Sequence, residues 1–358
     1  MTEMKKSSPP PNLFSSLPYD VVLNILARIS RFHRPTLSLV SRSFRSLIAS
    51  RELDATRTRI GKTEDCVYVC LDLNQNQRIN PRWFALAPTP KQQRSVPIPS
   101  FPYVYPKSPT VVSNGSELYI IGGYAKRRTG RRSKSVFLLD CRSHQWSKLK
   151  NMRVGRPNPA AEVIDGKIYV IGGCLSNKSE DWGEVYDIKT QTWEPLSPET
   201  LALTAQKSVV PGRLVMGGKV YDMNGLELNC RKHIRLVEMD KNVFCQILVS
   251  GGKLMWRDAK EDLEWGKVLG LEEMSTNYFV SMSNSCGGTR VIVWWEKDLE
   301  IWCAEVSFER YRFEDPWGIW EIEVSHRSEQ LWGVVEWSKS VFDDEYDAVF
   351  RHSALVTH

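Results

Sequence analysis

Between residues 13 and 58, apolar residues recur with the period of an α-helix. The first run occupies positions i, i+3, i+4 and i+7, which lie on one face of a helix. Its members are Val22, Ile25, Leu26 and Ile29. A second run, Phe44, Leu47 and Ile48, follows Ser41, a residue type that caps helix N-termini. We therefore expect two or three short helices here, preceded by a polar, proline-rich stretch over residues 1–12 that we expect to be disordered.

A helical unit of this size buries little surface by itself. Two interpretations of its apolar positions are therefore open. The helices can form an N-terminal cap on the next domain, or they can present a face on which a partner docks.

From Cys66 onward the pattern changes to short β-branched and aromatic runs separated by Gly, Asn, Asp and Pro, which is typical of strands and turns. The pattern also repeats, most clearly over residues 109–152 and 159–198. In each unit one apolar strand ends in a Gly-Gly pair, the next ends in Asp, and the last begins with Trp. The glycines and tryptophans are Gly122, Gly123 and Trp146 in the first unit and Gly172, Gly173 and Trp193 in the second. The pairs are about 50 residues apart, which is within the range of propeller blades.

Each part of this unit has a physical role. A Gly-Gly pair allows a tight turn or the close approach of a neighbouring backbone. The large face of Trp can pack between adjacent sheets. Because a single sheet would leave an apolar face in water, several sheets must stack side by side. We therefore predict a mainly β fold, a β-propeller, preceded by the small all-α unit.

Beyond residue 200 the repeat weakens but continues in three shorter units. They occupy residues 214–222, 249–268 and 287–306. Residues 67–72 and 82–86 look like the second half of a unit whose first half is missing before them. The C-terminal strands are the natural donor because ring closure removes exposed sheet edges, and the candidates are residues 331–337 and 348–350. We count about six blades over residues 66–358, with five or seven also open.

Composition narrows the function classes. The net charge of +6, from 48 basic and 42 acidic residues, is too small an excess to indicate a nucleic-acid binder by itself. The eight cysteines form no C-x-x-C pair and the six histidines never stand beside paired cysteines, so we expect no metal site and free thiols in a reducing compartment. No run approaches the ~20 apolar residues of a membrane span. The N-terminus also lacks the apolar segment of a secretory signal, so we expect the cytoplasm or nucleus.

Residues 17–50 resemble the F-box. The resemblance rests on the Leu17-Pro18 start, on Val40-Ser41 followed by Phe44-Arg45, and on the overall length. Phe44 stands where that family often has Trp. The two strong repeats resemble kelch motifs. The order, with the helical motif first and a degenerate kelch propeller second, resembles the large plant family of F-box/kelch-repeat proteins.

The resemblance implies a substrate-recognition adaptor of an SCF-type cullin-RING ubiquitin ligase. The F-box would bind a Skp-family adaptor and the kelch propeller would hold an unidentified substrate protein, while a separate conjugating enzyme would bring the chemistry. The residues expected to contact the adaptor are Leu17, Pro18, Leu23, Ile25, Leu26, Leu37, Val40, Phe44 and Leu47. The Gly-Gly pairs and the two tryptophans named above would have structural kelch roles.

Two other functions are weighed against this one. A kelch scaffold can act outside a ligase. An enzyme is disfavoured because the chain has no G-x-S-x-G, H-E-x-x-H or P-loop motif and no recognisable pair of His ligands such as kelch copper oxidases need. We therefore expect no catalytic residue and no cofactor.

Two further segments have more than one interpretation. Residues 126–134 carry six basic residues in nine between two expected strands. They form a solvated loop, a nuclear-import signal or a site for an acidic partner, and nucleic-acid contact is disfavoured because no aromatic residue interleaves them. Residues 311–330, with Trp317 and Trp320, look inserted between the last two strands, where they line a substrate face or form an extra hairpin.

Overall fold

A computed structural model of the chain describes most of it, in two compact units. One unit is helical and runs to Glu64, and the other is built of sheets and spans Asp65–Val356. The described residues are 17–73, 81–86, 95–125, 130–173, 182–196, 213–216, 219–222, 234–240, 243–258, 265–274, 278–285, 289–298, 300–312, 329–342 and 348–357.

The helical unit has four α-helices and one 3-10 turn in its described part. They are α1 (Tyr19–Ala27), η2 (Arg31–His33), α2 (Arg34–Leu37), α3 (Arg42–Ile48) and α4 (Arg51–Arg59). The two apolar runs of the sequence correspond to α1 and α3. Helix α4 was not predicted, because Leu53 is its only large apolar residue and periodicity therefore gives no signal there. Serine caps do mark both later helices, since Ser41 accepts from the Phe44 amide at 3.1 Å and Ser50 from the Leu53 amide at 3.3 Å.

The core of this unit lies between α1 and α4. Its buried members are Val22, Leu23, Leu26, Ala27 and Leu53. Arg57 of α4 is almost fully buried beside them and donates to the Ala27 carbonyl at 3.0 Å and to the Ile29 carbonyl. The Ala27 carbonyl ends α1 and the Ile29 carbonyl follows it, where the helix no longer supplies donors, so Arg57 satisfies both and holds the two helices together.

The second unit contains six sheets in its described part, five with four strands and one with two. In the first sheet the strands lie in the order β22 (Val349–Thr357), β1 (Asp65–Asp72), β2 (Arg82–Leu86) and β3 (Ser95–Pro97). In the second sheet the order is β4 (Thr110–Asn114), β5 (Glu117–Ile121), β6 (Val136–Asp140) and β7 (Gln145–Lys148). In the third sheet it is β8 (Ala160–Ile164), β9 (Lys167–Ile171), β10 (Gly183–Asp187) and β11 (Thr192–Pro195).

The fourth sheet has two strands, β12 (Arg213–Met216) and β13 (Lys219–Asp222). The fifth has the order β14 (Ile234–Asp240), β15 (Val243–Ser250), β16 (Lys253–Asp258) and β17 (Gly266–Lys267). After the 3-10 turn η4 (Glu272–Met274), the sixth has the order β18 (Phe279–Ser285), β19 (Arg290–Lys297), β20 (Glu300–Arg312) and β21 (Glu329–Phe342). These sheets are the blades of a β-propeller. Five are complete, where the repeats predicted about six, because the unit at 214–222 contributes the two strands β12 and β13.

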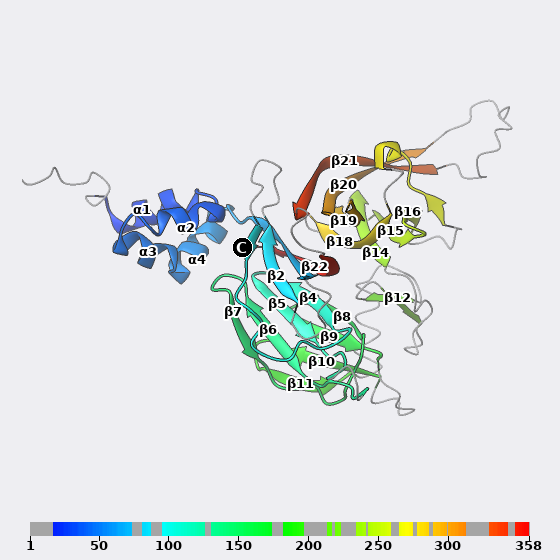
Figure 1. Cartoon of the computed structure of the whole chain (residues 1–358), viewed down its shortest axis with the longest axis horizontal. Helices are drawn as coiled ribbons and strands as arrows, with labels where there is room; N and C mark the ends of the chain where they lie inside the picture. The colour runs from blue at the N-terminus through cyan, green and yellow to red at the C-terminus, as the bar shows by residue number, and fades with distance from the viewer. Residues whose placement is uncertain are drawn as a thin grey trace, which may run out of the picture. The chain divides into compact units, whose positions relative to one another are not determined.

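Neighbouring blades share their cores. Tyr119 and Ile121 of β5 pack with Ala161 of β8 and Val170 of β9 in one buried cluster, and these two sheets lie side by side in Figure 1. A second cluster joins β14–β17 to β18–β21. A third joins β1 and β2 to β19 and β20. Stacking therefore covers the apolar faces that each sheet would expose by itself.

The first blade is completed by the C-terminal end of the chain. Strand β22 pairs with β1, and Arg351 forms an ion pair with Asp72 of β1. The expectation of a C-terminal donor is therefore confirmed for residues 348–350. It is wrong for residues 331–337, which belong to β21 and pair with β20 of the preceding blade, as in the pair of Trp337 with Glu305.

The segment at 311–330 begins and ends as an extension of this β20–β21 hairpin, with Tyr311 opposite Gln330. Trp317 and Trp320 lie outside the described residues. Among the described helices, none is long and apolar enough to span a bilayer.

Replacing Val356 with Asp is expected to destabilise the sheet unit by about 3 kcal/mol or more, because it places a charge in a fully buried position of β22. Urea denaturation followed by tryptophan fluorescence measures this. The neighbouring Thr357 is exposed, and Thr357→Asp should change stability by no more than about 0.5 kcal/mol. Equal effects of the two variants would show that β22 does not complete the first blade.

Candidate functional site

The helical unit exposes an unusual number of large apolar side chains. We call six of them the exposed apolar set. They are Leu17, Tyr19, Val21, Ile25, Leu39 and Val40, and their exposed fractions run from 37% to 76%. Four belong to α1 or the two residues before it, and two to the turn between α2 and α3. Helix α1 is thus apolar on its outer face as well as on the face that builds the core.

Local hydrogen bonds fix these positions. The Pro18 carbonyl accepts from the Val21 and Val22 amides at 3.0 and 3.1 Å, which starts α1 immediately after Leu17. The Tyr19 hydroxyl donates to the Glu52 carboxylate of α4, and this bond raises the pKa of Tyr19. The Leu39 and Val40 amides donate to the carbonyls three residues before them, those of Thr36 and Leu37, in a tight turn on which both side chains are exposed.

In the propeller, the Gly-Gly pairs mark places where two backbones approach closely. Gly122 has a φ of +69°, and a Cβ there would lie 2.2 Å from the Arg156 carbonyl oxygen. The next amide, from Gly123, donates to that same oxygen at 2.8 Å. In the third blade, a Cβ on Gly173 would lie 2.6 Å from the Pro157 oxygen. A side chain at Gly122 or Gly173 would therefore push apart the loops that join successive blades.

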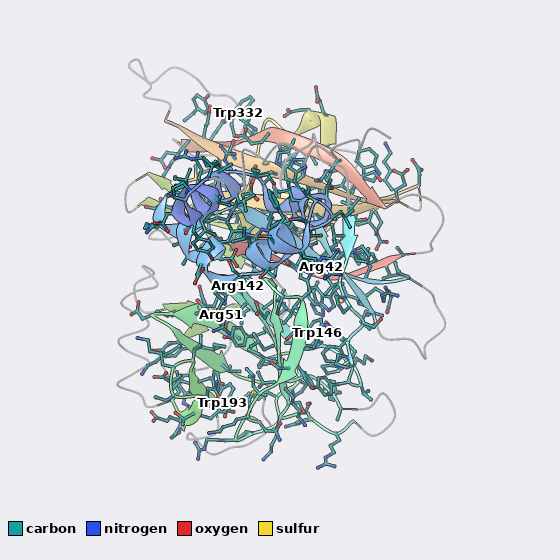
Figure 2. The ribbon with its side chains drawn as sticks, turned by 90° about the vertical axis from the view of Figure 1, so that its left-hand side faces the viewer. Arg42, Arg51, Arg142, Trp146, Trp193 and Trp332 are labelled. Carbon is teal, nitrogen blue, oxygen red and sulfur yellow. The ribbon has the colours of Figure 1, made fainter. Side chains whose placement is uncertain are left out.

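The two repeat tryptophans join each blade to the loop that precedes it. Trp146 donates from Nε1 to the Pro99 carbonyl at 2.9 Å, and Trp193 donates to the Lys150 carbonyl at 3.0 Å. Both are labelled in Figure 2. Each indole thus satisfies a loop carbonyl while its ring packs beside the blade, with Trp193 lying 4.9 Å from Tyr186 between ring centroids.

A buried ion pair that the sequence did not reveal fixes the loop between the second and third blades. Arg156 and Glu184 are both essentially inaccessible to solvent, and their side chains meet at 2.9 Å. Arg156 also donates to the carbonyls of Gly172 and Trp182 at 2.7 and 3.1 Å, while Glu184 accepts from the Arg153 amide at 2.7 Å. The partners are far apart in sequence and belong to no motif, so only the fold brings them together.

Comparison with known proteins agrees with this architecture. A model of the F-box domain matches residues 14–56, and a model of the FKB95 kelch-repeats domain matches residues 74–342, most of the chain. The putative F-box/kelch-repeat protein At5g03000 of Arabidopsis thaliana is 51% identical over 361 residues, which cover 99% of this chain and 92% of that protein.

This chain belongs to the F-box/kelch-repeat protein family. Two more Arabidopsis thaliana relatives extend the similarity over nearly the whole length. The putative F-box/kelch-repeat protein At3g46050 is 53% identical over 98% of this chain and 97% of its own, and the F-box/kelch-repeat protein At5g03020 is 47% identical over 97% and 96%.

The F-box residues expected to contact an adaptor fall into three groups by exposure. Leu17, Pro18, Ile25 and Val40 are exposed. Leu37, Phe44 and Leu47 are half-buried and pack against the core of the helical unit. Leu23 and Leu26 are core residues. Three members of the exposed apolar set, Tyr19, Val21 and Leu39, were not among the predicted contact residues, because they lie outside the periodic apolar run of the sequence. Ile25 belongs to that run with Val22 and Leu26, but the structure exposes it.

The described cysteines of the kelch unit are poorly placed for nucleophilic chemistry. All five, Cys66, Cys70, Cys141, Cys245 and Cys303, are buried free thiols. Burial raises the pKa of Cys245 to about 11 and that of Cys303 to about 12, so both stay protonated at neutral pH. Cys174, Cys230 and Cys286 lie outside the described residues. Within the described part of the chain, no three His, Cys, Asp or Glu residues gather as they would around a metal ion.

Replacing Arg156 with Leu is expected to destabilise the propeller by about 3–5 kcal/mol, because Glu184 would remain buried without its counter-charge. Chemical denaturation of the full chain measures this. The matched control is Arg142→Leu, which removes an exposed ion pair with Asp140 at 3.5 Å and should cost at most about 1 kcal/mol. The double variant Arg156→Leu with Glu184→Leu should be more stable than Arg156→Leu alone, and the absence of such recovery would contradict the pairing.

Proposed function

We propose that this chain is the substrate-recognition adaptor of an SCF-type cullin-RING ubiquitin ligase. Its F-box docks on a Skp-family adaptor, and its kelch propeller binds the substrate protein that is to be ubiquitinated. The observation that carries the proposal is the exposed apolar set on the F-box unit. We further propose that this assembly works in the cytoplasm or the nucleus.

The exposed apolar set supports docking because it is costly in water. Full burial of one large aliphatic or aromatic side chain is worth roughly 1.5–3 kcal/mol relative to exposure. Each member of the set keeps more than a third of its surface exposed, and together they occupy one short helix and one turn. A partner that covers these side chains removes their apolar surface from water, which the small core of the unit does not do by itself, and this burial favours binding.

The remaining predicted docking residues contribute in a different way. Leu23 and Leu26 hold α1 against α4, so they orient Val21 and Ile25 without contacting a partner themselves. Leu37, Phe44 and Leu47 are half-buried, and each keeps part of its side chain available at the unit's surface. In this proposal the exposed set makes the central contacts and the half-buried residues extend them.

The propeller suits the role of substrate holder. Its loops are fixed by the Trp-to-carbonyl bonds and by the Arg156–Glu184 pair, so their side chains are presented on a rigid framework. In a ligase of this type the ubiquitin-transfer chemistry resides in other subunits. The propeller therefore has to bind the substrate and hold it in place, and it needs no catalytic group.

Leu17→Ala combined with Pro18→Ala is expected to abolish co-purification of a Skp-family adaptor with the full chain. Both residues are exposed, so the double variant removes contact surface without opening the core. Affinity capture of the tagged chain from plant extract, probed for the adaptor, measures the outcome. Thr58→Ala with Arg59→Ala, at the exposed end of α4, is the matched control and should retain the adaptor.

Adaptor binding that persisted unchanged in the Leu17/Pro18 variant would disprove the docking assignment. Failure of the wild-type chain to capture any adaptor, with the propeller folded, would instead favour a kelch scaffold outside a ligase.

A further inference from the structure

One edge of the second blade carries basic residues without acidic ones among its described residues. In a four-stranded antiparallel blade, the loop between the second and third strands and the loop to the next blade leave from the same edge. Within the described part of the chain, that edge is formed by residues 98–109, 122–125, 130–135 and 149–159, which we call the mouth loops. None of their residues is Asp or Glu.

Backbone hydrogen bonds tie the mouth loops to one another. Tyr124 and Lys107 exchange two bonds of 2.8 and 3.1 Å, and Tyr124 also forms a β-bridge with Arg132. The Ala125 amide donates to the Arg131 carbonyl, and the Lys134 Nζ donates to the Arg153 carbonyl at 2.6 Å. The described end of the basic segment, residues 130–134, is therefore built into the blade.

These bonds gather a cluster of cations, which we call the basic mouth. Its members are Lys107, Arg131, Arg132, Lys134 and Arg153. Arg132 is half-buried and the other four are exposed. Among the described residues, no carboxylate lies within 4 Å of any of their charged groups, and the nearest acidic side chain that the loops contact, Glu184, is paired with Arg156.

The opposite edge of the same blades has a different charge pattern. Its turns, at 114–117, 140–145, 164–167 and 187–192, contain Glu117, Asp140, Asp165 and Asp187. Two basic residues on this edge are paired with them, Arg142 with Asp140 at 3.5 Å and Lys167 with Asp187 at 3.7 Å. Among the described residues, this edge therefore mixes acidic and basic side chains, whereas the mouth loops carry basic ones alone, which repel each other until a partner neutralises them.

We propose that the basic mouth is the substrate-recognition surface and that it binds an acidic segment, rich in Asp and Glu, of the substrate protein. This inference rests on the proposed adaptor function and adds the chemical class of the substrate. Clustered cations on rigid loops steer an acidic partner to the surface and fix its register. Three of the five members are Arg131, Arg132 and Arg153, and each guanidinium group can donate two hydrogen bonds to one carboxylate.

A protein segment fits this surface better than a nucleic acid does. Proteins that bind single strands alternate cations with aromatic faces on which bases stack. The segment 126–134 contains no aromatic residue. The mouth loops contain four aromatic residues, of which Phe101 is buried, Tyr105 and Tyr124 are half-buried, and Tyr103 already stacks on Phe137 with ring centroids 5.0 Å apart.

The test measures binding of a fluorescein-labelled ten-residue oligoglutamate to the full chain by fluorescence anisotropy. The variant Arg131→Glu with Arg153→Glu reverses two charges of the basic mouth while keeping the backbone bonds of both residues. The variant Arg142→Glu with Lys189→Glu makes the same change in net charge on the opposite edge (Arg142 is labelled in Figure 2). A fluorescein-labelled ten-nucleotide oligothymidylate is the nucleic-acid probe.

We expect the Arg131/Arg153 variant to bind oligoglutamate at least about tenfold more weakly than the wild type, and the Arg142/Lys189 variant to stay within about twofold. Binding should also weaken in 0.5 M salt, because screening shortens the reach of surface charges. The Arg131/Arg153 variant should keep the denaturation midpoint of the wild type, since both side chains are exposed. The Arg142/Lys189 variant should lose no more than about 1 kcal/mol, since it breaks only the exposed Arg142–Asp140 pair.

The proposal is overturned if the wild type does not bind oligoglutamate, if the two variants lose binding equally, or if oligothymidylate binds and depends on Arg131 and Arg153 while oligoglutamate does not. Adaptor capture by the same variants is measured in parallel. If only the ligase role is wrong, the chain binds oligoglutamate but captures no adaptor. If only the substrate class is wrong, the chain captures the adaptor but does not bind oligoglutamate.

Discussion

Each four-stranded sheet of this chain carries apolar side chains on both faces, and neither face can remain in water. Adjacent sheets bury these faces in shared apolar clusters. The clusters lie between β4–β7 and β8–β11, between β14–β17 and β18–β21, and between the first and last blades. The first blade depends on the end of the chain, because its strand beside β1 is β22. Asp72 and Arg351, which are 279 positions apart in the sequence, therefore become neighbours.

The stacking of the blades also fixes the conformation of the loops between them. Loops that join successive blades must pass close to the neighbouring blade, and Gly122 and Gly173 give them the space. The carbonyl groups exposed by this close passage are satisfied by Trp146, Trp193 and Arg156. A rigid edge results, and on it the basic residues are held near each other despite their repulsion. Residues that hold the loops in place thus alternate along them with the basic residues.

The helical unit divides its apolar residues between two tasks. Val22 and Leu26 face α4, while Val21 and Ile25, one position earlier in each case, face solvent. A helix that is apolar on both sides is stable in water only when one side is covered, and Leu53 with the stem of Arg57 covers the inner side. The outer side of α1 remains exposed, and it is the face on which we propose that the adaptor docks.

The sequence by itself determined the kinds of elements and their order. Period-3.6 spacing located α1 and α3, and the Gly-Gly and Trp repeats located the strands of two blades, because these signals lie within a few residues of each other. The C-terminal donor of the first blade was also predictable, since an unpaired first half-unit requires one. Helix α4 was not predictable, because a single large apolar residue, Leu53, gives no helical period. The role of β21 was not predictable either, because residues 331–337 and 348–350 could each have supplied the strand that completes the first blade.

Only the tertiary structure decided which apolar residues are exposed and which charges meet. In the sequence Ile25 shares the apolar period of Val22 and Leu26 and Leu23 does not, yet Leu23 is buried and Ile25 is exposed, because burial depends on where α4 packs. Arg156 and Glu184 are joined, and Arg131 and Arg153 are left uncompensated among the described residues, because loops from different blades meet at one edge. Contacts of this kind depend on distances in space, and the linear spacing of residues along the chain does not encode them.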